Sequence, residues 1–272
     1  MTDGSSTSGP ERSTRIDAGA AHSARVWNYL LGGKDNYAID RQTGDMILRM
    51  FPDIARIARV QRAFLARAVR YLAGEAGIRQ FLDIGTGLPT ADNTHQVAQR
   101  IAPESRIVYV DNDPLVLVHA HALLAGDPAG VTDYVEADVR DPEEILREAA
   151  RTLDFTRPVG LMMLGIMGQL PDGDDPWAIV RRLLEALPSG SYLALSDGTD
   201  TSATLNEAIR IYNQNSAGSY HLRSPERIAD FFEGLELMEP GVVTTCLWRP
   251  DFPALDPFST EVDAICGVGR KP

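Results

Sequence analysis

Two stretches of the sequence combine residue types that are suited to binding a nucleoside. Residues 80–84 show a buried-strand pattern that enters the turn Gly85-Thr86-Gly87, and residues 106–110 show a second pattern that ends at Asp111. Glycine lets the backbone approach a ligand where a side chain would block it, and a carboxylate accepts hydrogen bonds from hydroxyl groups. Ligands of open α/β sheets bind at the carboxyl ends of the strands. The two stretches therefore predict a nucleoside-binding crevice.

The glycine pattern also narrows the kind of nucleoside ligand. In the dinucleotide fingerprint, three glycines serve a tight turn, close approach to a pyrophosphate and helix packing, and a ribose-binding acid follows about 20 residues later. Here the chain continues through Pro89 without the third glycine. A ligand with a nucleoside but no pyrophosphate does not need that glycine, and S-adenosylmethionine is such a ligand. Asp111 is then the natural acceptor for the two ribose hydroxyls.

Strands and helices alternate from residue 79 onward, which is typical of a doubly wound parallel sheet. We expect strands at 80–84, 106–111, 132–137, 159–164 and 192–196. We expect one helix to begin near residue 91. Further helices should cover 114–125, 141–153, 175–187, 202–215 and 224–233. Two later extended segments, 235–243 and 264–269, are separated by a proline-rich connection and resemble an antiparallel pair that closes the sheet.

The N-terminal quarter of the chain has a different organisation. Residues 1–20 are rich in Ser, Thr, Gly and Asp without apolar periodicity, and we expect a disordered tail. From residue 21 to residue 77 the apolar residues recur at helical spacing and predict three helices. Gly32-Gly33 breaks the first helix and Pro52 precedes the third. We expect this segment to form a helical cap over the crevice.

Composition limits the partners and the location of the protein. The net charge of −12 disfavours a nucleic-acid backbone as the main partner, because phosphate affinity comes from clustered Lys and Arg, and it favours a small-molecule substrate. The sequence has no run of about 18 apolar residues and no signal-peptide pattern, so we expect a cytoplasmic protein without a membrane partner. The two cysteines lack metal-site spacing, and no metal site is expected. The sequence does not indicate an oligomeric state.

The chain resembles class I S-adenosylmethionine-dependent methyltransferases. More narrowly, it resembles a stand-alone family with a helical N-terminal extension and no generally assigned substrate. The resemblance rests on residues 24–37, which contain YLLGGKDNY, and on residues 81–90, 110–114 and 247–250. It implies an α/β, Rossmann-like, doubly wound seven-stranded sheet with one antiparallel strand, preceded by the helical cap of residues 21–77. Residues 78–272 would form the methyltransferase domain, with S-adenosylmethionine as the cofactor over the carboxyl edge of its sheet.

The resemblance also assigns cofactor-binding roles at the ends of the first two strands. Asp83, Gly85 and Gly87 would border the methionine portion. Asp111 would hold the ribose, with Asn112 beside it in the cofactor site. The alternative for Gly85 and Gly87 is that they only permit a strand-to-helix turn, and the alternative for Asp111 is an acid of a turn at a strand end.

Further roles fall at the ends of the third and fourth strands. The resemblance implies that Asp138 and the backbone N–H of Val139 read the adenine edge. Leu164 and Gly165 would line the cofactor near its sulfonium. The alternative for Asp138 is an N-cap of the helix that begins near Pro142.

The segment 29–37 is a further candidate for contact with the cofactor. Gly32-Gly33 interrupts a helix and is followed by polar residues that a buried core does not favour. We hypothesise that Lys34 meets the methionine carboxylate and that Tyr29 and Asn36, with Tyr37, face the cofactor or acceptor. The alternative is a structured turn between two helices.

The sequence offers no decisive general base, so the catalytic residues stay unassigned. Histidines that often follow the fourth and fifth strands in this family are replaced here by residues 167–169 and 196–198. Gln169, Asp172 and Asp197 either lie at the crevice mouth or cap loops. His221 is either a base or a loop histidine, and His22 falls in or near the tail.

The predicted function is methyl transfer from S-adenosylmethionine to an unidentified small-molecule acceptor. One alternative is a non-catalytic S-adenosylmethionine-binding regulatory or interaction protein. A third interpretation, an NAD(P)-dependent oxidoreductase, is disfavoured by Pro89 and by the antiparallel segments at the end of the chain.

Overall fold

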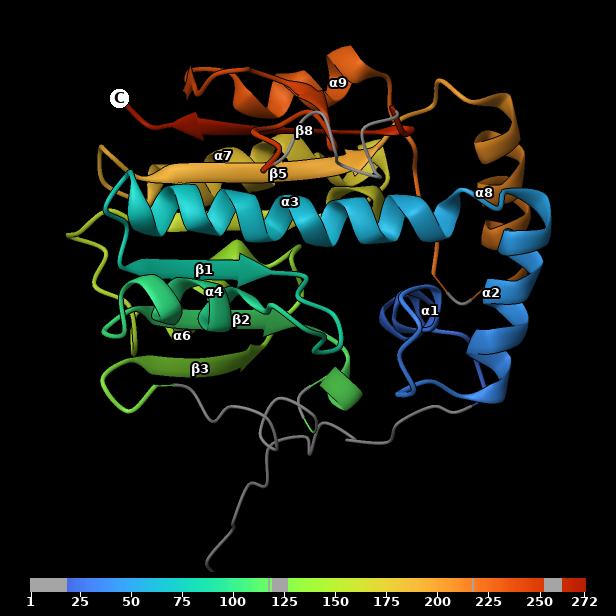
Figure 1. The fold of residues 1–272 in the computed structure, drawn as a ribbon, viewed down its shortest axis with the longest axis horizontal. Coiled ribbons are helices and arrows are strands. Elements are labelled where there is room, and N and C mark those ends of the chain that lie inside the picture. The colour runs from blue at the N-terminus through green and yellow to red at the C-terminus, as the bar shows by residue number, and fades with distance from the viewer. Residues whose placement is uncertain (1–18, 117, 119–126, 217, 252–260) are drawn as a thin grey trace, which may run out of the picture.

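The computed structural model describes residues 19–116, 118, 127–216, 218–251 and 261–272 (Figure 1). Most of the predicted tail, much of the predicted helix 114–125 and part of the proline-rich connection lie outside the described residues. His119 and His121 lie outside them as well.

The described strands form one sheet in the order β3-β2-β1-β4-β5-β8-β6, with β7 also paired to β8. Their bounds are Gln80–Ile84 for β1, Arg106–Asp111 for β2, Val131–Glu136 for β3, Gly160–Leu164 for β4, Tyr192–Gly198 for β5, Glu236–Leu237 for β6, Val243–Thr244 for β7 and Ala264–Arg270 for β8. Strands β1 to β5 are parallel, and β8 runs antiparallel to β5. The predicted Rossmann-like sheet with one antiparallel strand is confirmed.

The outer edge of this sheet differs from the predicted single segment 235–243. That segment forms β6 and β7, and both strands pair antiparallel with β8. Pro240 lies between them and has no N–H for a sheet hydrogen bond. The pairing is therefore interrupted, and the seventh position of the sheet holds two short strands.

Helices cover both faces of the sheet. Alternate strand residues face opposite sides, so Leu82 packs in a different core cluster from Phe81. On the Leu82 face lie α6 (Pro142–Ala149), α7 (Pro176–Glu185) and α9 (Pro225–Ala229). On the Phe81 face lie α4 (Thr94–Ile101) and the long α3 (Ile54–Gly74), which runs across the sheet in Figure 1. Phe64 of α3 is fully buried there, and truncating such a side chain costs about 3–5 kcal/mol.

A third group of helices lies beyond the carboxyl ends of the parallel strands (Figure 1). It contains α1 (Ser23–Leu30), α2 (Ala38–Met50) and α8 (Ala203–Asn215), which share an apolar cluster with the start of α3. Asp40 links α1 to α2: its carboxylate accepts from the backbone N–H groups of His22 and Tyr37 and pairs with Arg25 at 3.1 Å. Asp40 is fully buried, so these contacts fix how α1 approaches the sheet.

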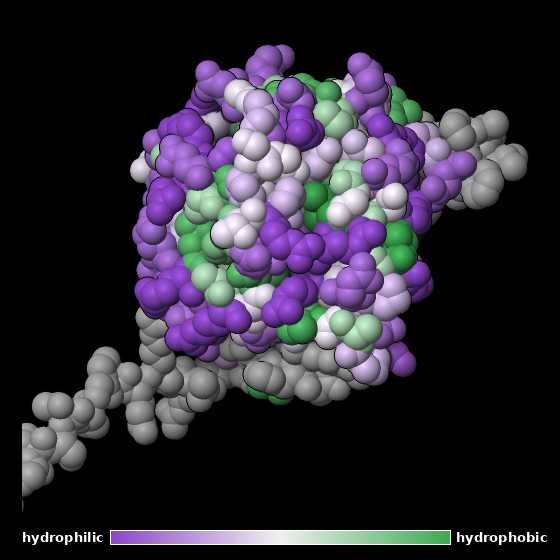
Figure 2. All heavy atoms as spheres, turned by 90° about the vertical axis from the view of Figure 1, so that its left-hand side faces the viewer, coloured by the Kyte–Doolittle hydropathy of each residue, from purple (hydrophilic) through white to green (hydrophobic). Residues whose placement is uncertain are grey.

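The amino ends of the parallel strands lie at the opposite end of the molecule, where the surface is mostly hydrophilic (Figure 2). Figure 2 shows that hydrophilic side chains cover most of this face, with apolar residues in small groups between them. None of the described helices has the length and apolar composition needed to cross a membrane.

Candidate functional site

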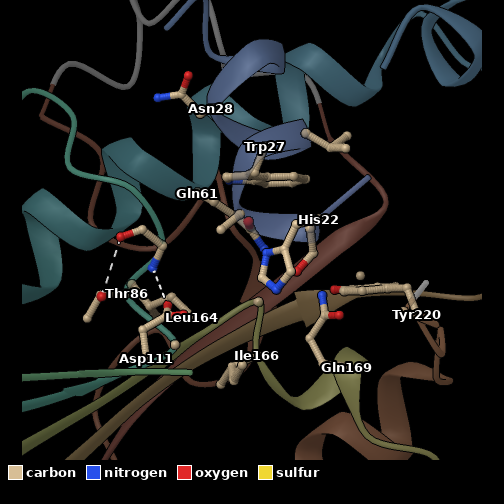
Figure 3. A pocket seen from close by; sticks show the side chains of 18 of the residues that line it. His22, Trp27, Asn28, Gln61, Thr86, Asp111, Leu164, Ile166, Gln169 and Tyr220 are labelled. Carbon is tan, nitrogen blue, oxygen red and sulfur yellow. Dashed lines mark hydrogen bonds between the residues drawn. The ribbon is translucent and has the colours of Figure 1, made fainter. Parts of the chain in front are cut away.

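A cavity of about 520 Å³ lies between the carboxyl ends of the strands and helices α1, α3 and α8 (Figure 3). Its volume falls in the range of about 300–1,000 Å³ that is typical of small-molecule sites. Nine of the twelve predicted cofactor-binding residues line it: Asp83, Gly85, Gly87, Asp111, Asn112, Asp138, Val139, Leu164 and Gly165.

The glycine turn after β1 requires glycine for two reasons. Gly85 and Gly87 have φ angles of 74° and 63°, in the left-handed region that disfavours other residues. A Cβ on Gly85 would also lie 2.6 Å from the side chain of Ile166, whereas a Cβ on Gly87 would meet nothing within 4 Å. The turn therefore exposes backbone at Gly85 and Gly87 on this wall of the cavity, with the side chain of Thr86 between them (Figure 3).

Asp111 is held rigidly at the end of β2. Its Oδ2 accepts from the N–H of Gly87 at 2.8 Å, and its Oδ1 accepts from the N–H of Asp113 at 3.0 Å. Burial raises the pKa of Asp111, while the two backbone N–H groups oppose that rise. Because a carboxylate oxygen can accept more than one hydrogen bond, Asp111 retains capacity for hydroxyl donors from the cavity.

Asp83 lies deeper than Asp111, at the end of β1. Its Oδ2 accepts from the hydroxyl of Thr94 at 2.6 Å. Burial raises the pKa of Asp83 to about 6, while Thr94 and the nearby Arg62 partly offset the rise. Arg62 also lines the cavity, and its Nη2 donates to the carbonyl of Ala91 at 3.0 Å. The Asp83 carboxylate and the Arg62 guanidinium therefore both lie beside the glycine turn.

Asp138 lies on the same wall, after β3. It accepts from the N–H of Arg140 at 2.9 Å and from the side-chain amide of Asn112 at 3.3 Å. Helix α6 is capped by a different residue, because Asp141 accepts from the N–H of Glu144 at 3.0 Å. The helix-cap alternative for Asp138 is therefore wrong.

The structure does not place the other three predicted residues, Tyr29, Lys34 and Asn36, on the cavity wall. The Tyr29 hydroxyl donates to Asp45 at 2.5 Å, on the side of α1 that faces α2. Lys34 is exposed. The Asn36 amide donates to the side chain of Asn28 at 2.9 Å, as a structured turn between helices would. Successive helical residues point in different directions, so α1 presents Trp27 and Asn28 to the cavity instead.

Several cavity residues were not predicted. His22 precedes α1, lines the cavity and lies with Nδ1 3.0 Å from Oδ2 of Asp113. Gln61 is buried on α3 beside Gly165, between Ile57 and Phe64 at helical spacing. Gln61 could have been found from the sequence, because it is a polar residue within an apolar helical stripe. His22 could have been found because it stands just before a helical pattern.

The ends of β4 and β5 bring together Gln169, Asp197 and Tyr220. Gln169 and Tyr220 line the cavity. Asp197 is 2% exposed, accepts from the N–H of Gly168 at 2.7 Å and also accepts from the Tyr220 hydroxyl. Burial raises the pKa of Asp197. The sequence left two alternatives open for Asp197, a position at the crevice mouth or a loop cap. In the structure its carboxylate lies behind Tyr220, which lines the cavity.

Two other candidates lie off the cavity wall. Asp172 pairs with Arg223 at 2.9 Å. The His221 ring contacts the hydroxyl of Ser219 through Nε2 at 2.9 Å. In the part of the chain that the structure describes, no group of three or more His, Cys, Asp or Glu side chains is arranged to hold a metal ion.

Comparison with known proteins connects this geometry to a family. A family model described as S-adenosyl methyltransferase matches residues 9–272. The chain belongs to this family. The methyltransferase uses S-adenosylmethionine, and its site fits that cofactor because the backbone of a glycine turn and an anchored carboxylate face one cavity.

Solved structures resemble this methyltransferase over most of its length. A DUF574 family protein from Streptomyces avermitilis is 49% identical, with a TM-score of 0.90, over 95% of this chain and 100% of that one. A protein from Thermobifida fusca is 44% identical, with a TM-score of 0.85, over 94% of this chain and 97% of that one. An S-adenosylmethionine-dependent methyltransferase from Anabaena variabilis shares the fold at 14% identity and a TM-score of 0.53, over 78% and 85% of the two chains. No curated protein matches.

Proposed function

We propose that this methyltransferase transfers the methyl group to a small molecule bound in the same cavity as the cofactor. The observation that carries the proposal is the continuity of the cavity, which runs from Asp111 to the apolar residues of α1 and α8. The strand ends would hold the cofactor and the helices would enclose the acceptor. The net charge of −12 further favours a small molecule over a nucleic acid.

The nine predicted residues on the wall support a definite arrangement of the cofactor. Asp111 would accept from the ribose hydroxyls, with Asn112 beside it, and Asp138 with the N–H of Val139 would bind the adenine edge. These residues follow β2 and β3, so the nucleoside would lie over that side of the sheet. Hydrogen bonds to a charged group contribute about 1.5–3 kcal/mol each, and Asp111 would be the main anchor because it would accept from two ribose hydroxyls.

The methionine portion would extend in the other direction along the sheet edge. Asp83, Gly85 and Gly87 would border it, and Leu164 and Gly165 after β4 would lie near the sulfonium. The exposed position of Lys34 gives no support to its predicted role with the carboxylate. Arg62 is the better candidate for that contact, because it lies on the cavity wall beside the glycine turn.

The bound cofactor supplies an activated methyl group on its sulfonium, and the protein contributes orientation and exclusion of water. Helices α1 and α2 would serve as the cap predicted for residues 21–77, while α3 extends from the cap onto the sheet. Trp27 and Leu30 of α1 line the cavity and would shield the acceptor from solvent.

Calorimetric titration with S-adenosylmethionine, S-adenosylhomocysteine and NADH tests the cofactor arrangement. We expect the wild type to bind the first two and not NADH. Asp111→Asn should weaken both by on the order of 100-fold, because a carboxylate that accepts hydroxyl donors is replaced by an amide. The control Asp230→Ala removes an exposed acid of the 3-10 helix after α9 and should leave the affinities unchanged.

Methyl transfer to a small molecule distinguishes an enzyme from a non-catalytic binding protein. Tight binding of S-adenosylhomocysteine with no transfer to any acceptor would favour the regulatory alternative. Binding of NADH in preference to both sulfur compounds would contradict the proposal.

A further inference from the structure

Tyr220 and Asp197 form a hydrogen-bonded pair at the β5 end of the cavity. The Tyr220 hydroxyl donates to Oδ1 of Asp197, and that carboxylate also accepts from the N–H groups of Gly168 and Gly198 at 2.7 and 2.9 Å. Asp197 is 2% exposed, whereas the ring of Tyr220 lines the cavity. The Tyr220 side chain therefore lies between the cavity and the buried carboxylate of Asp197.

The backbone around Tyr220 holds its ring in one place. A Cβ on Gly168 would lie 2.3 Å from Cζ of Tyr220, so the ring packs directly on glycine backbone. The side chain of Asn213 on α8 donates to the carbonyl of Tyr220 at 2.8 Å and accepts from its N–H at 2.7 Å. The N–H of His221 donates to the carbonyl of Gly168 at 2.7 Å. Tyr220 is thus fixed from both α8 and the end of β4.

The order of the strands places this pair next to the position proposed for the sulfonium. Along the carboxyl edge, β2 ends at Asp111, β4 at Leu164 and β5 at Gly198, with β1 between β2 and β4. Figure 3 shows Asp111 and Leu164 on one side of the cavity and Gln169 and Tyr220 on the other. An acceptor beside the sulfonium would therefore meet the Tyr220 hydroxyl.

The walls around Tyr220 combine apolar and polar side chains. The apolar ones come from α1, α3, α8 and the following loop, namely Trp27, Leu30, Leu31, Ile57, Leu205, Ile209 and Leu222. Gln61, Ser219 and Asp263 also line the cavity, and Asp263 accepts from the hydroxyl of Thr201 at 3.3 Å. Among the described residues that line the cavity, the potential cations are His22, Arg62 and Arg140. His22 contacts Asp113, Arg62 donates to the loop before α4, and Arg140 pairs with Asp138. Each of the three contacts a residue of the cofactor side, so among the described lining residues no lysine or arginine lies on the acceptor side to pair with an anionic acceptor.

We propose that the acceptor is a neutral, largely apolar molecule with a weakly acidic hydroxyl, a phenol, and that Tyr220 and Asp197 remove the proton of that hydroxyl. This inference rests on the proposed function. The bond from sulfur to the methyl carbon breaks with its electron pair left on sulfur, and a lone pair of the acceptor oxygen forms the new bond to carbon. The acceptor proton passes to the Tyr220 oxygen as the Tyr220 proton passes to Asp197. Asp197 ends protonated and later releases that proton to water.

The chemistry of the pair favours a hydroxyl acceptor over an amine. A neutral amine is nucleophilic before it loses a proton, whereas a hydroxyl gains from a base within hydrogen-bond reach. Because Tyr220 already donates its proton to Asp197, its oxygen can act only as a hydrogen-bond acceptor toward a hydroxyl in the cavity. Burial raises the pKa of Tyr220 well above its usual value, so this side chain relays a proton and does not store a negative charge. Burial also raises the pKa of Asp197, which makes it a better proton acceptor.

The test uses two phenols that differ in acidity. The full-length protein is supplied with methyl-labelled S-adenosylmethionine and with 2-naphthol, 4-nitrophenol, N-methylaniline or thiophenol in separate reactions at mildly alkaline pH. Under these conditions 2-naphthol is protonated and 4-nitrophenol is mostly ionised. We expect the wild type to methylate both phenols, with a higher KM for 4-nitrophenol because its ionised form meets no described lysine or arginine on the acceptor side.

The variant Tyr220→Phe removes only the hydroxyl and keeps the ring on Gly168. We expect kcat for 2-naphthol to fall by on the order of 100-fold with little change in KM, because the proton acceptor is lost. The loss for 4-nitrophenol should be much smaller, since that acceptor needs no base. Asp197→Asn should follow the same pattern. Tyr71→Phe, a matched change on α3 where the hydroxyl contacts Met238, controls for loss of a tyrosine hydroxyl elsewhere.

Calorimetry with S-adenosylhomocysteine separates failure of this inference from failure of the proposed function. If the wild type binds it but methylates only the amine, only the thiol or neither phenol, the acceptor assignment is overturned. An equal loss of kcat for both phenols in Tyr220→Phe would show that Tyr220 has only a structural role. A wild type that does not bind S-adenosylhomocysteine would overturn both the proposed function and this inference.

Discussion

The two sides of the cavity are built in different ways. The cofactor side consists of strand ends and their turns, in which short contiguous segments such as residues 83–87 and 110–112 supply several wall residues each. The acceptor side is assembled from distant segments, with Trp27 on α1, Gln169 after β4 and Tyr220 after α8. A cofactor common to many enzymes can be bound by a local motif, whereas acceptor specificity depends on how separate helices pack.

The largest effect should come from loosening the helical side while the strand ends stay intact. Asp40→Ala removes the carboxylate that pairs with the buried Arg25, and removing one partner of a buried ion pair costs about 3–5 kcal/mol. We expect urea denaturation to show that loss in the free energy of unfolding. The control Asp53→Ala changes an exposed acid before α3 that makes no side-chain cap and should have little effect.

The same variant sharpens the comparison between the two sides. Because Asp40 fixes α1 and not the strand ends, Asp40→Ala should weaken S-adenosylhomocysteine binding much less than Asp111→Asn does. If Asp40→Ala abolished that binding while the protein remained folded, the strand ends alone would not form the cofactor side.

The second largest effect is expected in the pH dependence of stability, and it comes from Asp83 on the cofactor side. The pKa of Asp83 is raised from 3.8 to about 6 in the folded protein by burial, so the native state holds a proton that the unfolded chain has lost between these values. Stability from this group is therefore present at low pH and is lost as the pH rises through about 6, by roughly 3 kcal/mol in total. Asp83→Asn removes this titration.

Urea denaturation of wild type and Asp83→Asn at pH values on both sides of this window measures the effect. The variant should gain stability relative to wild type as the pH rises. Parallel pH profiles for the two proteins would show that Asp83 does not titrate in this range.

The smallest effect distinguishes the two glycines of the turn. Alanine at either position is strained by the positive φ, which costs roughly 1–3 kcal/mol. Gly85→Ala should destabilise the free protein by about 1 kcal/mol more than Gly87→Ala, because only its Cβ collides with Ile166. The double variant Gly85→Ala with Ile166→Ala should not show that additional cost when compared with Ile166→Ala alone. Equal losses for the two single variants would contradict the close contact.

The parallel sheet could be predicted because its signals are local. Strands β1, β2, β4 and β5 contain short apolar runs next to turn residues, and β1 and β2 begin and end as expected. Asp111 and the glycines follow such runs directly, so their common edge follows from the parallel topology. The split of the last edge into β6 and β7 depends on pairing with β8, about 20 or more residues away in sequence, and was missed.

The acceptor side could not be predicted in the same way. The direction of Tyr29 toward Asp45 depends on the rotation of α1 against α2. Tyr220 reaches Asp197 only because Asn213 and two glycines hold its loop against the ends of β4 and β5. These contacts join segments that no sequence period relates, so the sequence named Asp197 as a candidate without revealing its partner.

The most direct test of the central claim is a crystal structure of the complex with S-adenosylhomocysteine. We predict that the ribose hydroxyls lie on Asp111, that the sulfur faces Leu164 and Gly165, and that the space beside Tyr220 stays open to an acceptor. A nucleoside bound instead among Trp27, Leu205 and Tyr220, with Asp111 free of ligand contacts, would contradict the division of the cavity into cofactor and acceptor sides.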